Sequence, residues 1–152
     1  MSAILKNGET GHVVITASVA ATQNRRGTGQ GPYLMSKYAV LSLSEALEHE
    51  LEWTNVGVTA LCPGPIATNL AQGARHRPDH LGGPELRPAA EAVMAERLAR
   101  TGIDPQLVGE RVIDAIRNKT FYAFVSVVPA DVIRARHRRI EVELETRWTT
   151  AY

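Results

Sequence analysis

A short run of apolar and β-branched residues near the start of the chain, His12–Ala17, is the feature that most restricts its fold. Such a run, bounded here by Gly11, is typical of a buried strand. Ser18 therefore falls at the carboxyl end of a strand. In an open α/β sheet this is the edge where ligands bind, because loops leave the strands there and helix N-termini point toward it.

A long amphipathic helix is expected after this strand. Glycines and a proline break the chain between residues 27 and 32, and a helical pattern runs from about Pro32 to Trp53. Its apolar residues recur at steps of three and four, whereas its acidic residues face elsewhere. The apolar set is Val40, Leu43, Leu47 and Leu51, and the acidic set is Glu45, Glu48 and Glu52.

Tyr33 and Lys37 lie one turn apart on this predicted helix and therefore share a face. An ammonium group within about 4–6 Å of a phenol favours the phenolate, which allows a tyrosine to exchange protons near neutral pH. The hydroxyl of Ser18 could then donate a hydrogen bond to a substrate oxygen. The same spacing also fits a tyrosine that packs at a helix start beside a solvated lysine, so the pair alone does not define a site.

A second strand is predicted over Val56–Cys62, and Pro63-Gly64-Pro65 ends it abruptly. Gly64 has no Cβ, so the backbone there can approach a ligand closely. Thr68 is placed to act as the N-cap of a following helix. A third strand is predicted over residues 121–128, so the sheet has about three strands with flanking helices.

Helices or loops are predicted for the rest of the chain. Residues 1–8 are the expected tail of a helix, residues 71–88 a mobile loop, and residues 89–101 a short helix. Asp104 is expected to cap a further helix that begins at Pro105. The predicted buried face of that helix consists of Leu107, Val108, Val112, Ile113 and Ile116.

A last helix is striped by Val132, Ile133, Ile140 and Leu144. Its basic residues are followed directly by acidic ones, which favours a solvated charged face over a site for a polyanion. The two groups are Arg134, Arg136, Arg138 and Arg139, and then Glu141, Glu143 and Glu145.

Charge and cysteine content exclude several classes of function. Seventeen basic and sixteen acidic residues give a formal charge of +1, so no nucleic-acid partner is predicted. The single cysteine, Cys62, allows no disulfide within the chain and is expected to pack at a buried strand end. No apolar run is long enough for a membrane span, and a cytoplasmic location is predicted. His76 and His80 are separated by Pro78, and no metal site is predicted there.

Three segments of the sequence together resemble the short-chain dehydrogenase/reductase family: residues 11–18, 33–40 and 58–68. The resemblance extends over roughly residues 11–70, in the order in which the family has these motifs. It implies an incomplete Rossmann-like, doubly wound parallel sheet. It also implies that Ser18, Tyr33 and Lys37 are catalytic, with Tyr33 as the acid or base, Lys37 as its activating cation and a ligand of the cofactor ribose, and Ser18 orienting the substrate oxygen.

The resemblance implies a cofactor as well, NAD or NADP, bound by Tyr33, Lys37, Pro63, Gly64, Ile66 and Thr68. Thr68 would contact the nicotinamide amide. The implied reaction is the interconversion of a small-molecule carbonyl and a secondary alcohol, and the implied assembly is a homo-oligomer formed through helix 33–53. The sequence predicts neither the substrate nor the choice between NAD and NADP.

Family members usually begin with a glycine-rich dinucleotide fingerprint, and none precedes Gly11. Residues 1–152 are therefore expected to form the carboxyl-terminal portion of one such domain, with the amino-terminal dinucleotide-binding half absent. The chain by itself is expected to bind a dinucleotide weakly or not at all. The alternative is a non-catalytic remnant or association module derived from the same family.

Overall fold

The computed structural model describes residues 8–23, 30–85 and 87–148, and the side chains of these residues as far as residue 145. The helix tail predicted for residues 1–8 therefore lies almost entirely outside the described residues. Within them, three parallel strands form one sheet in the order β1-β2-β3. The strands are β1 (Gly11–Thr16), β2 (Val56–Cys62) and β3 (Tyr122–Phe124). The predicted α/β class is confirmed.

Strand β2 lies in the centre of the sheet and is almost completely buried. It pairs with β1 from Gly11↔Val56 to Thr16↔Leu61, and with β3 from Ala60↔Tyr122 to Cys62↔Phe124. The third strand is shorter than the predicted range 121–128. Pairing stops at Phe124 because β2 ends at Cys62 and the next residue, a proline, has no N–H group to donate.

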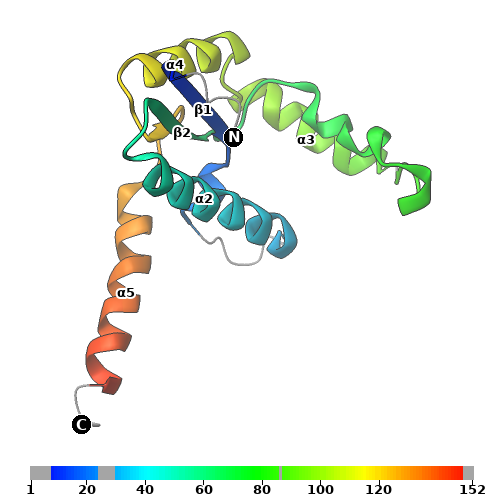
Figure 1. Ribbon diagram of the computed structural model, residues 1–152. Helices are drawn as coiled ribbons and strands as arrows, with labels where there is room; N and C mark the ends of the chain where they lie inside the picture. The colour runs from blue at the N-terminus through cyan, green and yellow to red at the C-terminus, as the bar shows by residue number, and fades with distance from the viewer. Residues whose placement is uncertain (1–7, 24–29, 86, 149–152) are drawn as a thin grey trace.

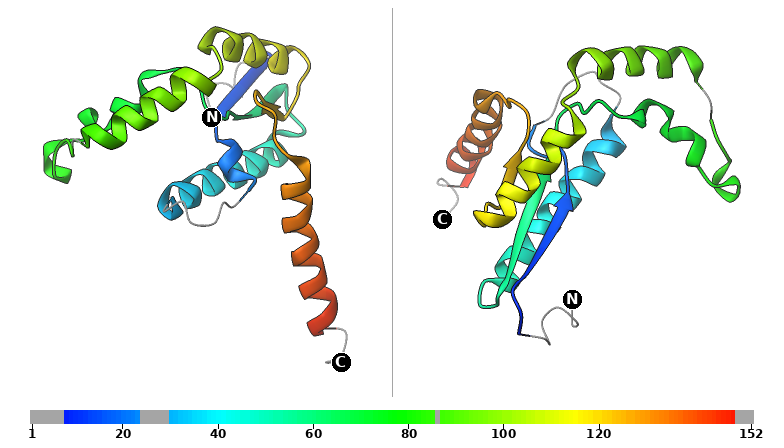
Figure 2. Two further views of the ribbon diagram at one scale, coloured as in Figure 1. Left: turned by 180° about the vertical axis from the view of Figure 1, so that it is seen from behind. Right: turned by 90° about the horizontal axis from the view of Figure 1, so that it is seen from above.

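Helices cover both faces of the sheet, which makes it doubly wound (Figure 2). Alternate residues of a strand point to opposite faces. Ala60 and Cys62 pack against Leu41, while Leu61 packs with Val108 and Ala115. The elements that cover the two faces are α2 (Gly31–Leu51) on one side and α4 (Pro105–Arg117) on the other.

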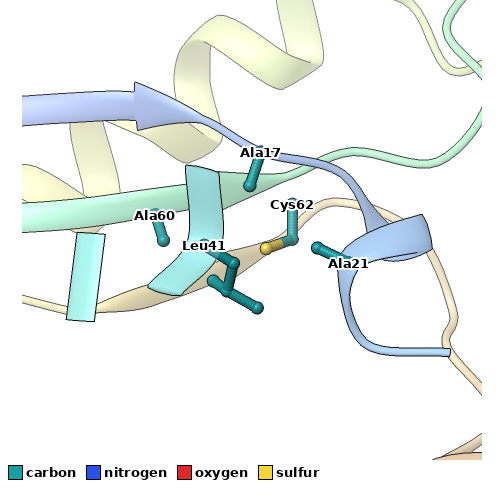
Figure 3. Packing of buried hydrophobic residues seen from close by; sticks show 5 residues of the cluster. All are labelled: Ala17, Ala21, Leu41, Ala60 and Cys62. Atoms are coloured by element: carbon teal, nitrogen blue, oxygen red, sulfur yellow. The ribbon is translucent and has the colours of Figure 1, made fainter. Parts of the chain in front are cut away.

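Beneath α2, Leu41 of the helix packs on four small side chains (Figure 3), namely Ala17, Ala21, Ala60 and Cys62. Small residues on the sheet let the helix approach closely, and this sets its rotation. The buried side of α2 is accordingly occupied by Leu41 and Ser44, whereas Leu43, predicted to be buried, is 64 % exposed. Ser44 satisfies its hydroxyl by donating to the Val40 carbonyl at 2.8 Å.

Two further predictions about helix faces need correction. Glu45, expected to face away from the core, is only partly exposed. Its carboxylate accepts a hydrogen bond from the Tyr122 hydroxyl at 2.7 Å. On α4, Leu107 and Ile113 are exposed, and the buried residues are Val108 and Ala115. The N-cap prediction for α4 is confirmed, because the Asp104 carboxylate accepts from the backbone N–H of Gln106 at 2.8 Å.

The chain segment that connects β2 to α4 forms an arm (Figure 1). It extends away from the sheet and its covering helices, which are called the body below. Where a loop was predicted over residues 71–88, the structure has two short 3₁₀ helices, and the helix α3 (Pro88–Thr101) packs against the first of them. The two ends of the arm meet, because the Ala67 N–H donates to the Ile103 carbonyl at 2.9 Å and the Ile103 N–H donates to the Pro65 carbonyl at 3.0 Å. The arm consists of η2 (Asn69–His76), η3 (Asp79–Leu81) and α3 (Pro88–Thr101).

The last helix, α5 (Ala130–Trp148), also projects from the body (Figures 1 and 2). Most of its described side chains are exposed. None of the helices in the described parts of the chain combines the length and the apolar character that a bilayer crossing requires.

Candidate active site

Ser18 lies at the carboxyl end of β1, as predicted, and is buried. It serves as the N-cap of a short 3₁₀ helix, η1 (Val19–Ala21), and its Oγ accepts the Ala20 N–H at 3.1 Å. The same hydroxyl donates a long hydrogen bond, 3.5 Å, to the carbonyl of Pro63. Because that bond is at the limit of hydrogen-bonding distance, the Ser18 proton can be redirected to a better acceptor at little cost.

Lys37 reaches the same end of β1 from α2. Its ammonium group donates to the Thr16 carbonyl at 3.1 Å. An ammonium group has three N–H donors, so this bond leaves donors available for a ligand. The structure therefore brings Lys37 and Ser18 to one edge of the sheet. Lys37 and Thr16, which are joined there, are 21 residues apart in the sequence.

Tyr33 lies one turn before Lys37, in the first turn of α2. It is 44 % exposed, so its ring is accessible from solvent. Its carbonyl accepts the hydroxyl proton of Ser36 at 2.7 Å, which ties down the first turn of the helix. Part of the glycine-containing stretch before this helix, residues 24–29, lies outside the described residues.

The segment after β2 contains the four other predicted binding residues, Pro63, Gly64, Ile66 and Thr68. Gly64 packs closely under the chain that follows β3, since a Cβ at this position would lie 2.5 Å from Ser126 Oγ. Ile66 forms an isolated parallel bridge with Ile103 and packs with the α4 side of the core. The close approach predicted for Gly64 is therefore made, among the described residues, to Ser126.

Thr68 occupies the N-cap position of η2, as predicted, in an extended conformation. Its side chain, however, makes no capping hydrogen bond, so that part of the prediction is wrong. The side chain is exposed. The Thr68 hydroxyl is thus not used to satisfy the start of the helix.

Cys62 is confirmed as a packing residue. It is fully buried at the end of β2, and this burial raises the pKa of its thiol to about 11, although a hydrogen bond from the Ser18 backbone opposes the shift. A thiol with a raised pKa is largely protonated near neutral pH and is a poor nucleophile. Within the described ranges, no cluster of three or more His, Cys, Asp or Glu side chains could hold a metal ion.

A pocket of about 570 Å³ lies at the opposite end of the sheet, near His12, His49 and Lys119. Next to it a partly buried chain of polar groups links β1, β2 and the segment before β3. His12 Nε2 lies 2.8 Å from Thr59 Oγ1, which donates to the Thr120 carbonyl at 2.8 Å. Sequence reasoning missed this network, because its members are 47 and 61 residues apart and no local pattern connects them. It does not touch the predicted catalytic residues.

Comparison with known proteins identifies the family. The profile of the family described as short chain dehydrogenase matches residues 1–79, which is more than half of the chain. This chain belongs to the short chain dehydrogenase family. The fold agrees, because a short chain dehydrogenase/reductase from Burkholderia phymatum, solved in complex with NAD, superposes with a TM-score of 0.76 at 31 % identity. That match covers 91 % of this chain and 51 % of the other.

Two further proteins are similar to this chain. The uncharacterized oxidoreductase YbbO of Escherichia coli strain K12 is 30 % identical over 129 residues, which is 85 % of this chain and 40 % of the relative. The F189W actinorhodin polyketide ketoreductase, solved with NADPH, is 29 % identical with a TM-score of 0.56, and the match covers 80 % of this chain and 46 % of that one. This chain therefore spans about half or less of the length of these three proteins.

Proposed function

We propose that this chain supplies the proton-transfer site and the nicotinamide-side contacts of an NAD(P)-dependent oxidoreductase that interconverts a carbonyl and a secondary alcohol. Membership of the short chain dehydrogenase family supports the oxidoreductase class. The relatives solved with NAD and with NADPH support a nicotinamide cofactor. The reaction of the whole protein and the role of each residue are our proposal.

One observation carries the proposal, the hydrogen bond from Lys37 Nζ to the Thr16 carbonyl. It holds a cation at the strand end where the buried Ser18 hydroxyl donates only a long hydrogen bond to the Pro63 carbonyl, one helical turn after Tyr33. A phenol near an ammonium group can exchange a proton with a substrate oxygen, and a hydroxyl can stabilise negative charge on that oxygen. A solvated lysine at a helix surface would not need a backbone carbonyl of the neighbouring strand.

In the proposed reaction Tyr33 donates a proton to the substrate oxygen, or accepts one from it in the reverse direction. Ser18 gives up its long bond to Pro63 and donates to the same oxygen. Lys37 contacts the cofactor ribose with its remaining N–H groups. The nicotinamide cofactor, when bound, supplies or removes the hydride.

The polar groups at this edge fit the ribose and nicotinamide end of such a cofactor. Lys37 has N–H donors beyond the one used on Thr16, and the Thr68 hydroxyl is not used as a helix cap. The sequence contains no Gly-x-Gly-x-x-Gly fingerprint for the pyrophosphate. We therefore assign to this chain's own residues only the nicotinamide end of the cofactor.

A non-catalytic association module remains the second candidate, and one observation favours it. The Ser18 hydroxyl already accepts from Ala20 and donates to Pro63, so its hydrogen bonds are satisfied without a substrate. A purely structural serine at the start of η1 would look the same. Exposed apolar residues on α2, including Met35 and Leu43, support the separate proposal that α2 contacts a second copy.

Titration with NADH and NADPH distinguishes the two candidates. A chimaera in which the amino-terminal half of the Burkholderia phymatum relative precedes this chain should bind one of the two and reduce a carbonyl compound. The 152-residue chain by itself should bind weakly or not at all, because it has no pyrophosphate fingerprint. A folded chimaera that binds neither cofactor would favour the association module, and micromolar binding by the chain alone would refute our assignment of only one end of the cofactor.

A further inference from the structure

Helix α5 makes few contacts with the other elements that the structure describes. Near its start, the Arg136 guanidinium lies over the ring of Tyr38 on α2, 5.2 Å from the ring centroid. The helix then extends away from the body (Figures 1 and 2). Beyond this contact, Ile140 and Leu144 are 46 % and 59 % exposed. Because helices of this length gain most of their stability from packing an apolar face, these side chains indicate a partner.

Three apolar residues of α5, together with His137, follow the spacing of a coiled coil, whereas Val132 and Val142 lie off this line. Ile133, His137, Ile140 and Leu144 are separated by alternating steps of four and three residues. This spacing aligns them along one side of the helix, as the d and a positions of a heptad repeat. Ile133 is half-buried at the body end of this seam, and the seam continues along the projecting part of the helix.

The charges of α5 are separated along its length. Four arginines lie between residues 134 and 139, and three glutamates lie between residues 141 and 145. In a parallel pair of such helices, the two arginine-rich halves would lie side by side. In an antiparallel pair, each arginine-rich half lies beside a glutamate-rich half, and complementary charge of this kind sets the orientation of partners.

We propose that α5 pairs with α5 of a second copy of this chain as an antiparallel coiled coil. When the pair is centred between residues 138 and 139, Leu144 of one copy lies opposite Ile133 of the other, and Ile140 lies opposite His137. The positions that flank the seam then bring Arg134 opposite Glu141, and Arg136 opposite Glu143. This surface is separate from the candidate active site and from the face of α2 proposed above.

The test compares full-length chains that carry two different affinity tags, co-expressed and captured through one tag. An acidic variant carries Arg134→Glu and Arg136→Glu, and a basic variant carries Glu141→Arg and Glu143→Arg. Each variant should capture itself on the order of tenfold less than the parent does, because the flanking pairs become repulsive. The acidic and basic variants together should recover the parental level. Association through α2 or the sheet gives the same background in every combination, so the differences between combinations report on α5.

The matched control carries Arg138→Glu and Arg139→Glu, which changes the net charge as much as the acidic variant does, at positions facing away from the seam. It should capture itself as well as the parent. Because Arg136 also covers Tyr38, recovery in the acidic and basic mixture shows that the acidic variant still folds. Parental self-capture by both charged variants, or no recovery in the mixture, would overturn the proposal.

Orientation is tested by oxidative crosslinking in a Cys62→Ala background. Copies with Ile133→Cys should crosslink to copies with Leu144→Cys, because an antiparallel pair places these positions opposite each other. Two copies with Leu144→Cys should not crosslink. The reverse pattern would mean a parallel pair and would refute the antiparallel arrangement.

Discussion

The two ends of the sheet use similar polar side chains in different ways. At the amino end, His12, Thr59 and the Thr120 carbonyl bind one another, and Thr59 is fully buried. At the carboxyl end, Lys37 uses one donor on Thr16 and Ser18 holds Pro63 by a long bond. A polar network that is closed on itself stabilises the fold, whereas the unused donors of Lys37 and the weakly held proton of Ser18 are available to a ligand.

This difference explains why the pocket of about 570 Å³ at the amino end is not our candidate site. Three of its lining side chains, His12, Thr54 and Asn55, already make hydrogen bonds within the fold. Variants at the carboxyl end should therefore change the reaction, and variants at the amino end should change stability. Each of the following experiments uses the chimaera described above, so that both properties are measured on one protein.

Tyr33→Phe should have the largest effect. It removes the proposed proton-transfer group and keeps the ring, so turnover should fall by ~10²–10⁴ while cofactor affinity and unfolding free energy change little. Steady-state kinetics and a cofactor titration measure this. Tyr122→Phe is the control, because it removes a hydroxyl that is bonded to Glu45. Turnover of Tyr33→Phe within about threefold of the parent would exclude the proposed role.

Lys37→Met should affect both properties. Loss of the ammonium group should weaken cofactor binding by roughly tenfold or more, since hydrogen bonds to charged groups contribute about 1.5–3 kcal/mol. It should also lower turnover and leave the Thr16 carbonyl without this donor. Calorimetric titration beside urea denaturation separates the effects. An unchanged cofactor affinity would show that Lys37 does not contact the cofactor.

Thr59→Val should show the opposite pattern. The substitution preserves shape but leaves the Thr120 carbonyl and the His12 ring nitrogen without the hydroxyl that links them. Unsatisfied buried groups cost about 1–3 kcal/mol, so the urea midpoint should fall while turnover per folded molecule stays the same. Thr22→Val is a control with a more exposed hydroxyl. A loss of turnover without a loss of stability would contradict the division between the two ends.

The smallest expected effect is a dependence of stability on pH. Burial, and secondarily the charge of Lys119, lower the pKa of His12 below its ordinary value of 6.5. The unfolded chain therefore binds a proton more readily than the folded protein, so His12 destabilises the fold increasingly as the pH falls below about 6.5. The stability lost between about pH 7.5 and about pH 5.5 should be smaller in His12→Gln than in the parent. A larger loss in the variant would reverse the sign assigned to His12.

Local patterns predicted the strands and helices well where the end of an apolar run or a proline marks their boundaries. The run that ends at Ala17 and the break at Pro63 defined β1 and β2 to within a residue or two. The third strand was predicted too long because Val125 and Val127 continue the apolar pattern. Strand length there depends on where the neighbouring strand stops, which is not a local property.

The sequence likewise predicted only part of the candidate site. Ser18 follows from the strand end alone, and the shared helix face of Tyr33 and Lys37 follows from their spacing. The bond from Lys37 to Thr16 depends on how α2 is rotated over the sheet. That rotation follows the small residues Ala60 and Cys62, which is why Leu41 is buried in place of Leu43.

The meeting of the two ends of the arm has a consequence for how such a protein can change over evolution. Ala67 and Ile103 are joined through their backbones, and a Cβ on Gly102 would collide with the backbone of Ile66 and Ala67. The arm is thus an excursion that leaves and returns at one point of the body. Doubling the length of such a loop costs only about 0.6 kcal/mol in closure entropy. Insertions and deletions in residues 69–101 can therefore accumulate while the sheet and the residues at its carboxyl end stay unchanged.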